Sequence, residues 1–206
     1  MNSDDISSLA LNRLSVYLRC LRHLQREGVA RISSQELARR FQLSAAQIRK
    51  DLAHFGEFGI RGVGYEVETL RGRLEELLGL GREHSAVIVG AGNIGRALAR
   101  FPGFNRGAFR IRGIFDNDPE RVGQRLNHLV VRSSEELVEV AREVEAEIGI
   151  LAVPASAAQE NLDALVRAGV RAVLNFAPVP LKTVPEVRVK SVDLRVFLEE
   201  LAFFLR

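Results

Sequence analysis

The segment Gly90-Ala91-Gly92-Asn93-Ile94-Gly95 spaces three glycines as a phosphate-binding turn requires. It directly follows residues 86–89, a continuous apolar run of strand length. In such a turn Gly90 permits the tight bend, Gly92 lets a pyrophosphate approach the backbone, and Gly95 lets the following helix pack closely on the sheet. The free N–H groups at the N-terminus of that helix attract an anion. The segment therefore predicts a dinucleotide site, and a glycine-rich turn that binds no dinucleotide is the alternative.

A carboxylate stands where such a site would hold the ribose of an adenosine. The next predicted strand, residues 111–115, is followed by Asp116, which lies 21 residues after Gly95. A carboxylate there can accept hydrogen bonds from both ribose hydroxyls, and Asp118 adds negative charge that would repel a 2′-phosphate. NAD(H) is therefore favoured over NADP(H) as the cofactor.

The nicotinamide half of the cofactor should lie across the switch point of the sheet, at the carboxyl ends of the later strands. Backbone groups of residues 152–154 and 175–180 could hold its carboxamide. For the second of these segments, a plain loop after a strand is the alternative. The predicted cofactor contacts are Gly90, Gly92, Asn93, Ile94, Gly95, Asp116, Val153, Pro154, Asn175, Ala177 and Pro178.

Positive charge is concentrated in the first third of the chain, although the net charge of all 206 residues is only +3. Residues 11–64 hold 10 Lys and Arg against 4 Asp and Glu, whereas residues 65–206 hold 19 against 20. A basic block followed by a near-neutral body indicates two modules, the first of which faces a polyanion. An ordinary arginine-rich surface is the alternative.

One helix of the basic block has the side chains that a DNA groove requires. Ile48, Leu52 and Phe55 recur at helical spacing over residues 45–55, which leaves Ala46 and Lys50 on the opposite face. Small side chains there permit close approach to a groove, and basic ones can donate to phosphates or base edges. The predicted DNA contacts are Ser34, Ala46, Gln47, Arg49, Lys50 and Arg61.

The elements that would position these contacts form a winged helix-turn-helix. A long first helix ends near Gly28, and Ser33 or Ser34 caps a short second helix. Residues 42–44 form a tight turn into the third helix, and four glycines between residues 56 and 64 suit a wing. An amphipathic connecting helix is predicted over residues 66–80.

Helix and strand patterns alternate after Gly81, which predicts a parallel sheet covered by helices on both faces. The predicted fold class is α/β. Three parts are expected: an N-terminal winged helix-turn-helix domain, a Rossmann-like doubly wound parallel sheet and a C-terminal helix. Their predicted bounds are residues 1–79, 80–193 and 194–206. The predicted strands are residues 86–89, 111–115, 129–131, 148–153, 172–176 and 187–192, and the helices between them are 94–100, 134–143 and 157–168.

The final segment, residues 194–206, has nine apolar residues in thirteen. A helix this apolar must bury most of its circumference, either on its own domain or against a partner chain. No apolar run approaches the roughly 20 residues that span a bilayer. The acidic N-terminus also lacks the apolar stretch of a secretory signal, so we expect a cytoplasmic protein with no membrane partner.

The sequence offers no clear catalytic group. A dehydrogenase needs an acid or base beside the nicotinamide, yet two histidines lie in the basic block, and His84 and His128 lie at the wrong ends of strands. Cys20 is the only cysteine, which excludes an intrachain disulfide and a zinc site with two or more Cys ligands. We therefore predict a nucleotide sensor with neither catalytic residues nor a metal. A small NAD-dependent oxidoreductase whose basic domain is incidental, and a regulator that senses coenzyme A, are the alternatives.

Short segments in both halves resemble Rex, the bacterial family of redox-sensing repressors. In the first half they are Arg49-Lys50-Asp51-Leu52, Phe55-Gly56-Glu57-Phe58-Gly59 and Arg61-Gly62-Val63-Gly64-Tyr65. In the second half they are residues 90–98 (GAGNIGRAL), 115–119 (FDNDP), 153–155 (VPA), 174–178 (LNFAP) and 192–194 (VDL). The resemblance covers nearly the whole chain. It implies a homodimer with C-terminal helices swapped between subunits, which binds palindromic operators on double-stranded DNA and releases them when NADH replaces NAD⁺.

The resemblance also implies a switch built from three residues. In Rex proteins an arginine of the N-terminal helix, a tyrosine near the cofactor and an aspartate before the swapped helix exchange partners. Arg13 and Asp193 match two of these positions, but Phe101 stands where family members usually have tyrosine. Without that hydroxyl, a hydrogen bond from the aromatic residue to the aspartate cannot form here.

Overall fold

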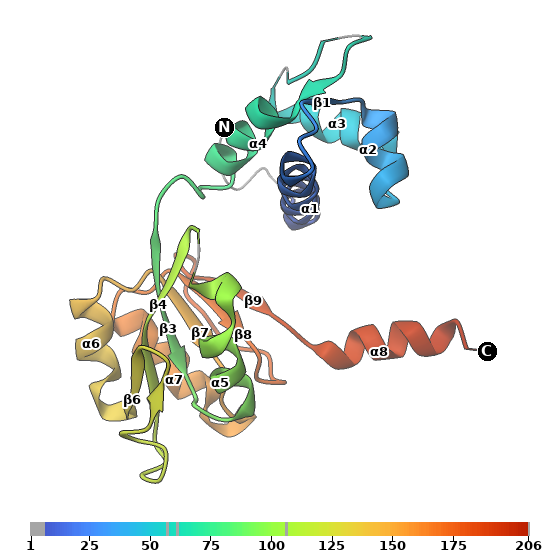
Figure 1. Cartoon of the computed structure of the whole chain (residues 1–206). Coiled ribbons are helices and arrows are strands. Elements are labelled where there is room, and N and C mark those ends of the chain that lie inside the picture. Colours follow the sequence, from blue (N-terminus) through green and yellow to red (C-terminus); the bar gives the residue numbers. More distant parts are fainter. Residues whose placement is uncertain (1–6, 57, 61, 106, 206) are drawn as a thin grey trace. The chain divides into compact units, whose positions relative to one another are not determined.

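Residues 7–56, 58–60, 62–105 and 107–205 are described by a computed structural model of the chain (Figure 1). The chain divides into two units, Met1–Arg82 and Glu83–Arg206, and each unit has hydrophobic core residues of its own. Among the described residues, no helix combines the length and the apolarity that crossing a bilayer would require.

The first unit is a winged helix-turn-helix, as predicted. Its core is formed by apolar side chains of α1, α3 and α4, including Leu14, Leu21, Ile48 and Leu74, which are completely buried. The two short strands pair antiparallel, and Ile32 lies opposite Tyr65. In chain order the elements are α1 (Ser8–Arg26), β1 (Arg31–Ile32), α2 (Ser34–Phe41), α3 (Ala45–Phe55), β2 (Tyr65–Glu66) and α4 (Val67–Leu77).

Side-chain caps determine where the second and third helices of this unit begin. The Ser33 hydroxyl accepts a hydrogen bond from the Glu36 N–H at 3.1 Å, so Ser33 rather than Ser34 caps α2. Ser44 caps α3 by accepting from the Gln47 N–H at 3.3 Å, as predicted. Between the two helices Gln42 adopts the left-handed conformation with φ +55°, which ends α2 and allows the tight turn.

The second unit is built around a sheet with the strand order β5-β6-β4-β3-β7-β8-β9. All neighbours pair parallel except β5 and β6, which form an antiparallel hairpin. The parallel strands therefore follow the order 3-2-1-4-5-6 of a dinucleotide-binding Rossmann fold. The hairpin strand β5 is an addition that the alternating pattern did not predict. The strands are β3 (His84–Val89), β4 (Phe109–Asp116), β5 (Arg125–Leu126), β6 (Leu129–Ser133), β7 (Ile148–Leu151), β8 (Ala172–Asn175) and β9 (Arg188–Ser191).

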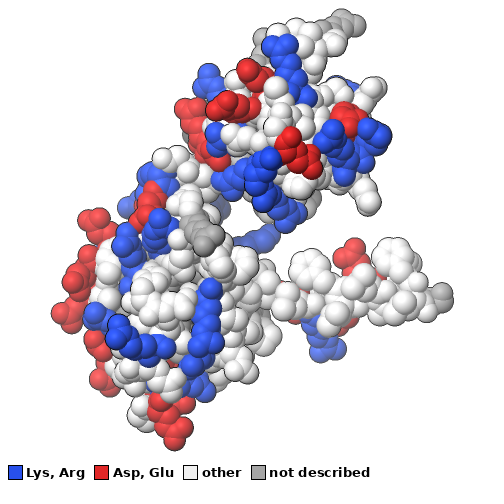
Figure 2. All heavy atoms as spheres, in the orientation of Figure 1, with Lys and Arg blue, Asp and Glu red and all other residues white. Residues whose placement is uncertain are grey.

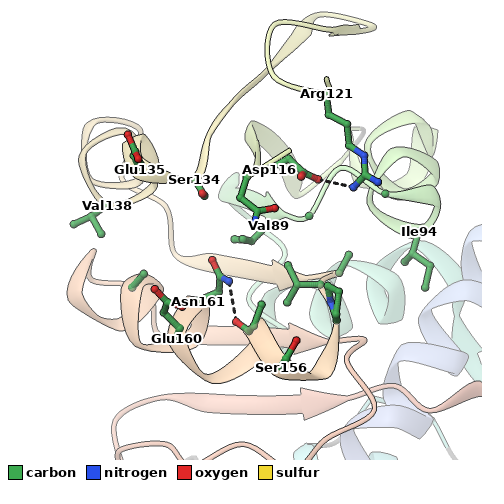
Figure 3. A pocket seen from close by; sticks show the side chains of 18 of the residues that line it. Val89, Ile94, Asp116, Arg121, Ser134, Glu135, Val138, Ser156, Glu160 and Asn161 are labelled. Atoms are coloured by element: carbon green, nitrogen blue, oxygen red, sulfur yellow. Dashed lines mark hydrogen bonds and ion pairs between the residues drawn. The ribbon is translucent and has the colours of Figure 1, made fainter. Parts of the chain in front are cut away.

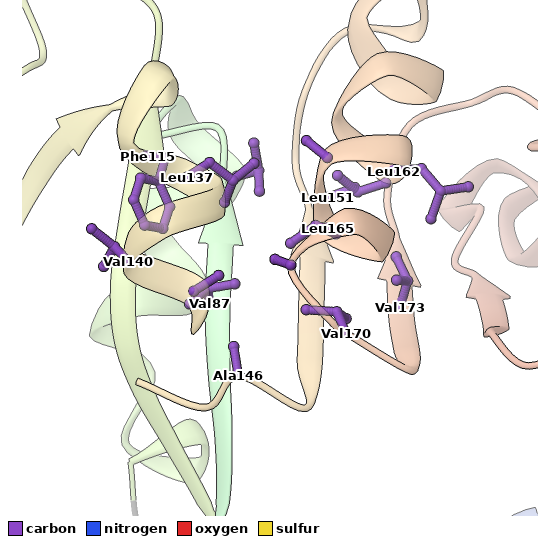
Figure 4. Close-up of a cluster of buried hydrophobic side chains, with 14 of the residues drawn as sticks. Val87, Phe115, Leu137, Val140, Ala146, Leu151, Leu162, Leu165, Val170 and Val173 are labelled. Atoms are coloured by element: carbon purple, nitrogen blue, oxygen red, sulfur yellow. The ribbon is translucent and has the colours of Figure 1, made fainter. Parts of the chain in front are cut away.

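Helices cover both faces of this sheet because the strands bury apolar side chains on both faces. On one face Val87 and Phe115 pack with Leu137 of α6 and Leu162 of α7 (Figure 4). On the other face Ile88 belongs to a cluster that includes residues of α5. The helical elements are α5 (Asn93–Arg100), the 3₁₀ turns η2 (Pro102–Phe104) and η3 (Ser134–Glu136), α6 (Leu137–Glu143), α7 (Ala155–Arg167) and α8 (Leu194–Phe203).

Helix α8 buries none of its residues within the chain. Phe197 is 57% exposed, Leu201 61% and Phe203 61%. Figure 2 shows α8 as a mainly uncharged surface that few acidic or basic groups interrupt. Of the two alternatives for this segment, burial on its own domain does not occur in the described structure.

Candidate functional site

The glycine-rich turn joins β3 to α5. Gly90 has a φ of +99°, and a Cβ atom at this position would lie 2.3 Å from the Ala152 carbonyl oxygen. A Cβ atom at Gly95 would lie 1.8 Å from the Gly90 carbonyl oxygen, so only glycine lets α5 pack this closely on the turn. At Gly92, by contrast, the nearest described atom is Arg121 Nη1, at 3.9 Å. The space above Gly92 is open, which fits the pyrophosphate of a dinucleotide.

The N-terminus of α5 adds hydrogen-bond donors to this space. Gly92 is the N-cap residue, and no side chain of the described residues caps the helix. The first N–H groups of a helix have no acceptor within the helix, and the helix dipole makes this end positive. The N–H groups of Asn93 and Ile94 are placed where they can bind phosphate oxygens, and their contact with a cofactor stays a prediction.

Asp116 ends β4 beside the turn and is only 5% exposed. Its Oδ2 accepts from the Ala91 N–H at 2.6 Å and its Oδ1 from the Asp118 N–H at 2.9 Å, while Arg121 Nη1 donates to Oδ2 at 3.1 Å. Burial raises the pKa of Asp116, but the hydrogen bonds from Asp118, Ala91 and Arg121 outweigh burial and bring the pKa below its ordinary value. Asp116 is therefore ionised at neutral pH and can only accept hydrogen bonds, as two ribose hydroxyls require.

A cavity of about 910 Å³ extends from the turn between α6 and α7 (Figure 3). This volume lies within the range of small-molecule and cofactor sites. The structure brings together seven of the predicted cofactor contacts here, namely Gly90, Gly92, Asn93, Ile94, Asp116, Val153 and Pro154. Sequence reasoning missed further lining residues, including Arg121, Ser134, Glu135, Val138, Glu160 and Asn161. Of these residues, only Arg121 could have been suspected from the sequence, because it is a charged residue five positions after Asp116.

Asn175, Ala177 and Pro178 are not among the residues that line this cavity. Asn175 is completely buried, and its Oδ1 accepts from the Ala177 N–H at 2.9 Å. Its Nδ2 donates to the Ala177 carbonyl at 3.1 Å and to Ser191 Oγ at 3.2 Å. Asn175 thus shapes the loop after β8 and joins it to β9. Contact between this loop and a nicotinamide stays a prediction.

Helix α3 presents the face that we predict to contact DNA. Ala46, Arg49 and Lys50 are exposed on it. Arg49 Nη1 donates to Ser34 Oγ at 3.0 Å and so joins α3 to the start of α2. Both residues line a cavity of about 740 Å³ that reaches the glycine-rich wing. Arg61, another predicted contact, lies outside the described residues.

A buried carboxylate that the sequence did not single out lies behind this face. Asp51 of α3 is 5% exposed and accepts from Arg13 Nε at 2.6 Å and Arg13 Nη2 at 2.8 Å. It also accepts from the Tyr17 hydroxyl at 2.8 Å and from Gln47 Nε2 at 2.7 Å. The hydrogen bonds from Arg13 are the main reason that the pKa of Asp51 falls to about 2. The predicted DNA contact Gln47 is thus half-buried and oriented by Asp51.

The three residues of the implied switch have these partners. Arg13 pairs with Asp51, as described above. Phe101 follows α5, is 55% exposed and meets Phe104 edge to face, with the ring centroids 5.4 Å apart. Asp193 caps α8, because its Oδ1 accepts from the Arg195 N–H at 2.9 Å. An exchange of partners among Arg13, Phe101 and Asp193 stays a prediction.

Two family models match parts of the chain. Residues 5–53 match the family described as "Putative DNA-binding protein N-terminus", and residues 82–179 match "CoA binding domain". Together with the two folds, these matches define a DNA-binding regulator with a nucleotide-binding domain.

The chain aligns over nearly its whole length with proteins named as repressors. "Redox-sensing transcriptional repressor Rex" of Carboxydothermus hydrogenoformans is 47% identical over 206 residues, which are 100% of this chain and 99% of that protein. "Redox-sensing transcriptional repressor Rex 1" of Thermotoga maritima is 48% identical over 192 residues, covering 93% and 91% of the two chains. The chain belongs to the Rex family of redox-sensing transcriptional repressors.

Solved structures confirm the fold that the sequence predicts. The structure of RSP "in complex with beta-NAD+ and operator DNA" has a TM-score of 0.92 at 38% identity, covering 97% of this chain and 92% of that one. RSP "in complex with beta-NADH" has a TM-score of 0.89 at 36% identity, covering 98% and 94%. Because the full-length relatives are repressors, the oxidoreductase alternative is not favoured.

Proposed function

We propose that this chain is a cytoplasmic repressor that binds palindromic operators as a homodimer and releases them when NADH replaces NAD⁺. The proposal rests on one observation. A chain of the Rex family has both the exposed face of α3 that we predict to contact DNA and a cleft whose residues fit a dinucleotide. RSP, whose complex with operator DNA matches 97% of this chain, is described in one complex with beta-NAD+ and operator DNA and in another with beta-NADH.

Different residues of the cleft would hold different parts of the dinucleotide. The N–H groups at the start of α5 and the open space at Gly92 suit the pyrophosphate, and Asp116 suits the adenosine ribose. Val153 and Pro154 line the side of the cleft where the nicotinamide would lie. When bound, the cofactor supplies a ring whose charge depends on its redox state.

That charge provides a physical basis for sensing. The oxidised nicotinamide ring is positive and the reduced ring is neutral, and burying an unpaired charge is costly. An apolar pocket to which Phe101 and Pro154 contribute would therefore prefer NADH. Arg13, Phe101 and Asp193 are the proposed switch residues, and Phe101 acts through packing because it has no hydroxyl.

Helix α8 supports the homodimer. Its exposed apolar residues, Phe197 and Leu201 among them, need a partner, and a second copy of the chain provides one. A dimer with twofold symmetry matches a palindromic operator, since each winged helix then reads one half-site. We propose that the α8 helices are exchanged between the two subunits.

A gel shift on a palindromic operator tests the proposal when NAD⁺ and NADH are varied separately. We expect NADH to release the DNA and NAD⁺ to permit binding. Incubation with NADH and carbonyl substrates gives the enzyme control, in which steady loss of NADH absorbance would support an oxidoreductase instead. Release by coenzyme A, and not by NADH, would support a regulator that senses coenzyme A.

A further inference from the structure

Arg121 lies at the part of the cleft that Asp116 marks for an adenosine ribose (Figure 3). Its Nη1 is 3.1 Å from Asp116 Oδ2, and its Nε is 3.1 Å from Asp118 Oδ2. The side chain of Arg121 is 42% exposed and that of Asp116 only 4%, so the guanidinium reaches a buried carboxylate from the solvent side. One arginine therefore pairs with both carboxylates of this end of the cleft.

Arg121 and a ribose need the same oxygen atoms. An ionised carboxylate offers about four lone-pair positions. Three of those on Asp116 are used, by the Ala91 N–H, the Asp118 N–H and the Arg121 guanidinium. Two ribose hydroxyls therefore cannot both donate to Asp116 while Arg121 stays.

A guanidinium at this place is also what a 2′-phosphate requires. Dinucleotide sites that accept the 2′-phosphate use a nearby arginine, because guanidinium and phosphate form paired charge-assisted hydrogen bonds. A phosphate monoester carries between one and two negative charges at neutral pH, and here it would meet the carboxylates of Asp116 and Asp118. The positive charge of Arg121 already compensates these carboxylates.

We propose that Arg121 determines cofactor specificity and belongs to a latent 2′-phosphate site that Asp116 and Asp118 suppress. The chain prefers NAD(H) over NADP(H) because two carboxylates hold its arginine, and not because a cation is missing. This inference rests on the proposed binding of a dinucleotide.

The test is a binding titration of the full-length protein with NADH and NADPH. Adenosine 5′-monophosphate and adenosine 2′,5′-bisphosphate serve as further probes because they report on the adenosine end alone. In Asp116→Ala we expect weaker NADH binding and tighter NADPH binding, so that the ratio of the two dissociation constants shifts toward NADPH by about tenfold or more. The bisphosphate should gain over the monophosphate in the same way.

A second substitution separates the role of Arg121 from the loss of negative charge. Asp116→Ala combined with Arg121→Ala should lose the gained affinity for NADPH. Asp116→Ala combined with Arg132→Ala is the matched control and should keep it. Arg132 is also half-exposed, pairs with Glu136 at 3.4 Å and is not among the residues that line the cleft.

Equal NADPH affinities of Asp116→Ala with and without Arg121→Ala would overturn the inference. If Asp116→Ala does not fold, Asp118→Asn with and without Arg121→Ala makes the same comparison. An asparagine there keeps the Oδ1 acceptor that binds the Glu120 N–H at 2.9 Å. Failure of the proposed function looks different, because the wild-type protein would then bind neither NADH nor NADPH.

Discussion

Asp51 shows how one buried residue holds the predicted DNA-binding face of α3 in place. Its carboxylate accepts four hydrogen bonds, two from Arg13 and one each from Tyr17 and Gln47. Arg13 and Tyr17 belong to α1, so this carboxylate fixes α1 against α3. A hydrogen bond to a charged group contributes about 1.5–3 kcal/mol, and loss of one partner leaves others unsatisfied.

Asp51→Asn is expected to lower the free energy of unfolding by about 2 kcal/mol at neutral pH. The pKa of Asp51 is about 2 in the folded chain and 3.8 ordinarily, a difference that corresponds to a similar energy. Because the folded pKa is depressed, the contribution is fully present above the ordinary pKa and is lost as the pH falls toward 2. Urea unfolding between neutral and acid pH measures it.

Glu36→Gln is the control for this substitution. Glu36 pairs with Arg39 and Arg40 at the surface, where solvent screens the charges, so its effect should be much smaller. If Asp51→Asn costs the same stability at acid as at neutral pH, the loss comes from packing rather than from the carboxylate charge.

Two glycines of one turn should respond to the same substitution in opposite ways. In Gly95→Ala the new Cβ would meet the Gly90 carbonyl oxygen at 1.8 Å, so we expect lower stability, by about 1–3 kcal/mol or more. In Gly92→Ala the new Cβ has room, and the φ of −71° suits alanine. Gly92→Ala should therefore fold normally but bind dinucleotide more weakly. Thermal melting and NADH titration of both variants check this, and an equally destabilised Gly92→Ala would contradict it.

At the scale of elements, local signals determined what the sequence could predict. The bounds of α3, residues 45–55, and its Ser44 cap agree with the prediction, since both depend on neighbours in sequence. Strands β1, β2 and β5 have two residues each, which is too short for a periodic pattern. Strand β5 pairs with the neighbouring β6 in a hairpin, whereas β1 and β2 form because these two distant segments pair with each other. The contact between Arg13 and Asp51, 38 residues apart, escaped prediction for the same reason.

The residues of the cleft also divide into those that local sequence predicts and those that only tertiary packing brings in. Gly90, Gly92 and Asp116 were predictable because each has a fixed place in a strand–turn–helix motif. Glu135 of η3 and Glu160 of α7 line the cleft only because the sheet order brings their elements together. Motif spacing therefore predicts the phosphate and ribose end of the site, and tertiary packing determines the rest.

The two functional elements should be separable by substitution. Lys50 lies exposed on α3, and Lys50→Ala should weaken operator binding, reduce its salt dependence by about one counterion and leave the NADH affinity unchanged. Asp116→Ala should instead retain operator binding but respond poorly to NADH. Fluorescence anisotropy on labelled operator, together with NADH titration, measures both. Loss of both activities in either variant would contradict the separation.

At the scale of the whole molecule, α8 should determine the oligomeric state. Phe197 and Leu201 are four residues apart and thus share a face of the helix. Phe197→Asp combined with Leu201→Asp places charge on that face, so we expect a folded monomer that binds the operator poorly. Glu200→Gln on the same helix is the control. Sedimentation velocity gives the mass, and a double variant that stays dimeric would refute the role of α8.

In the proposed dimer, binding of the cofactor and binding of the operator affect each other in both directions. If NADH lowers the affinity for the operator, the operator must lower the affinity for NADH by the same factor, which for typical couplings is about 5- to 150-fold. NADH titrations of the wild-type protein with and without operator measure this factor. In the proposed mechanism the coupling requires two DNA-binding domains whose spacing depends on the cofactor, so in the α8 double variant the factor should approach one. Equal NADH dissociation constants for the free and the operator-bound wild-type protein would show that the cofactor does not govern DNA release.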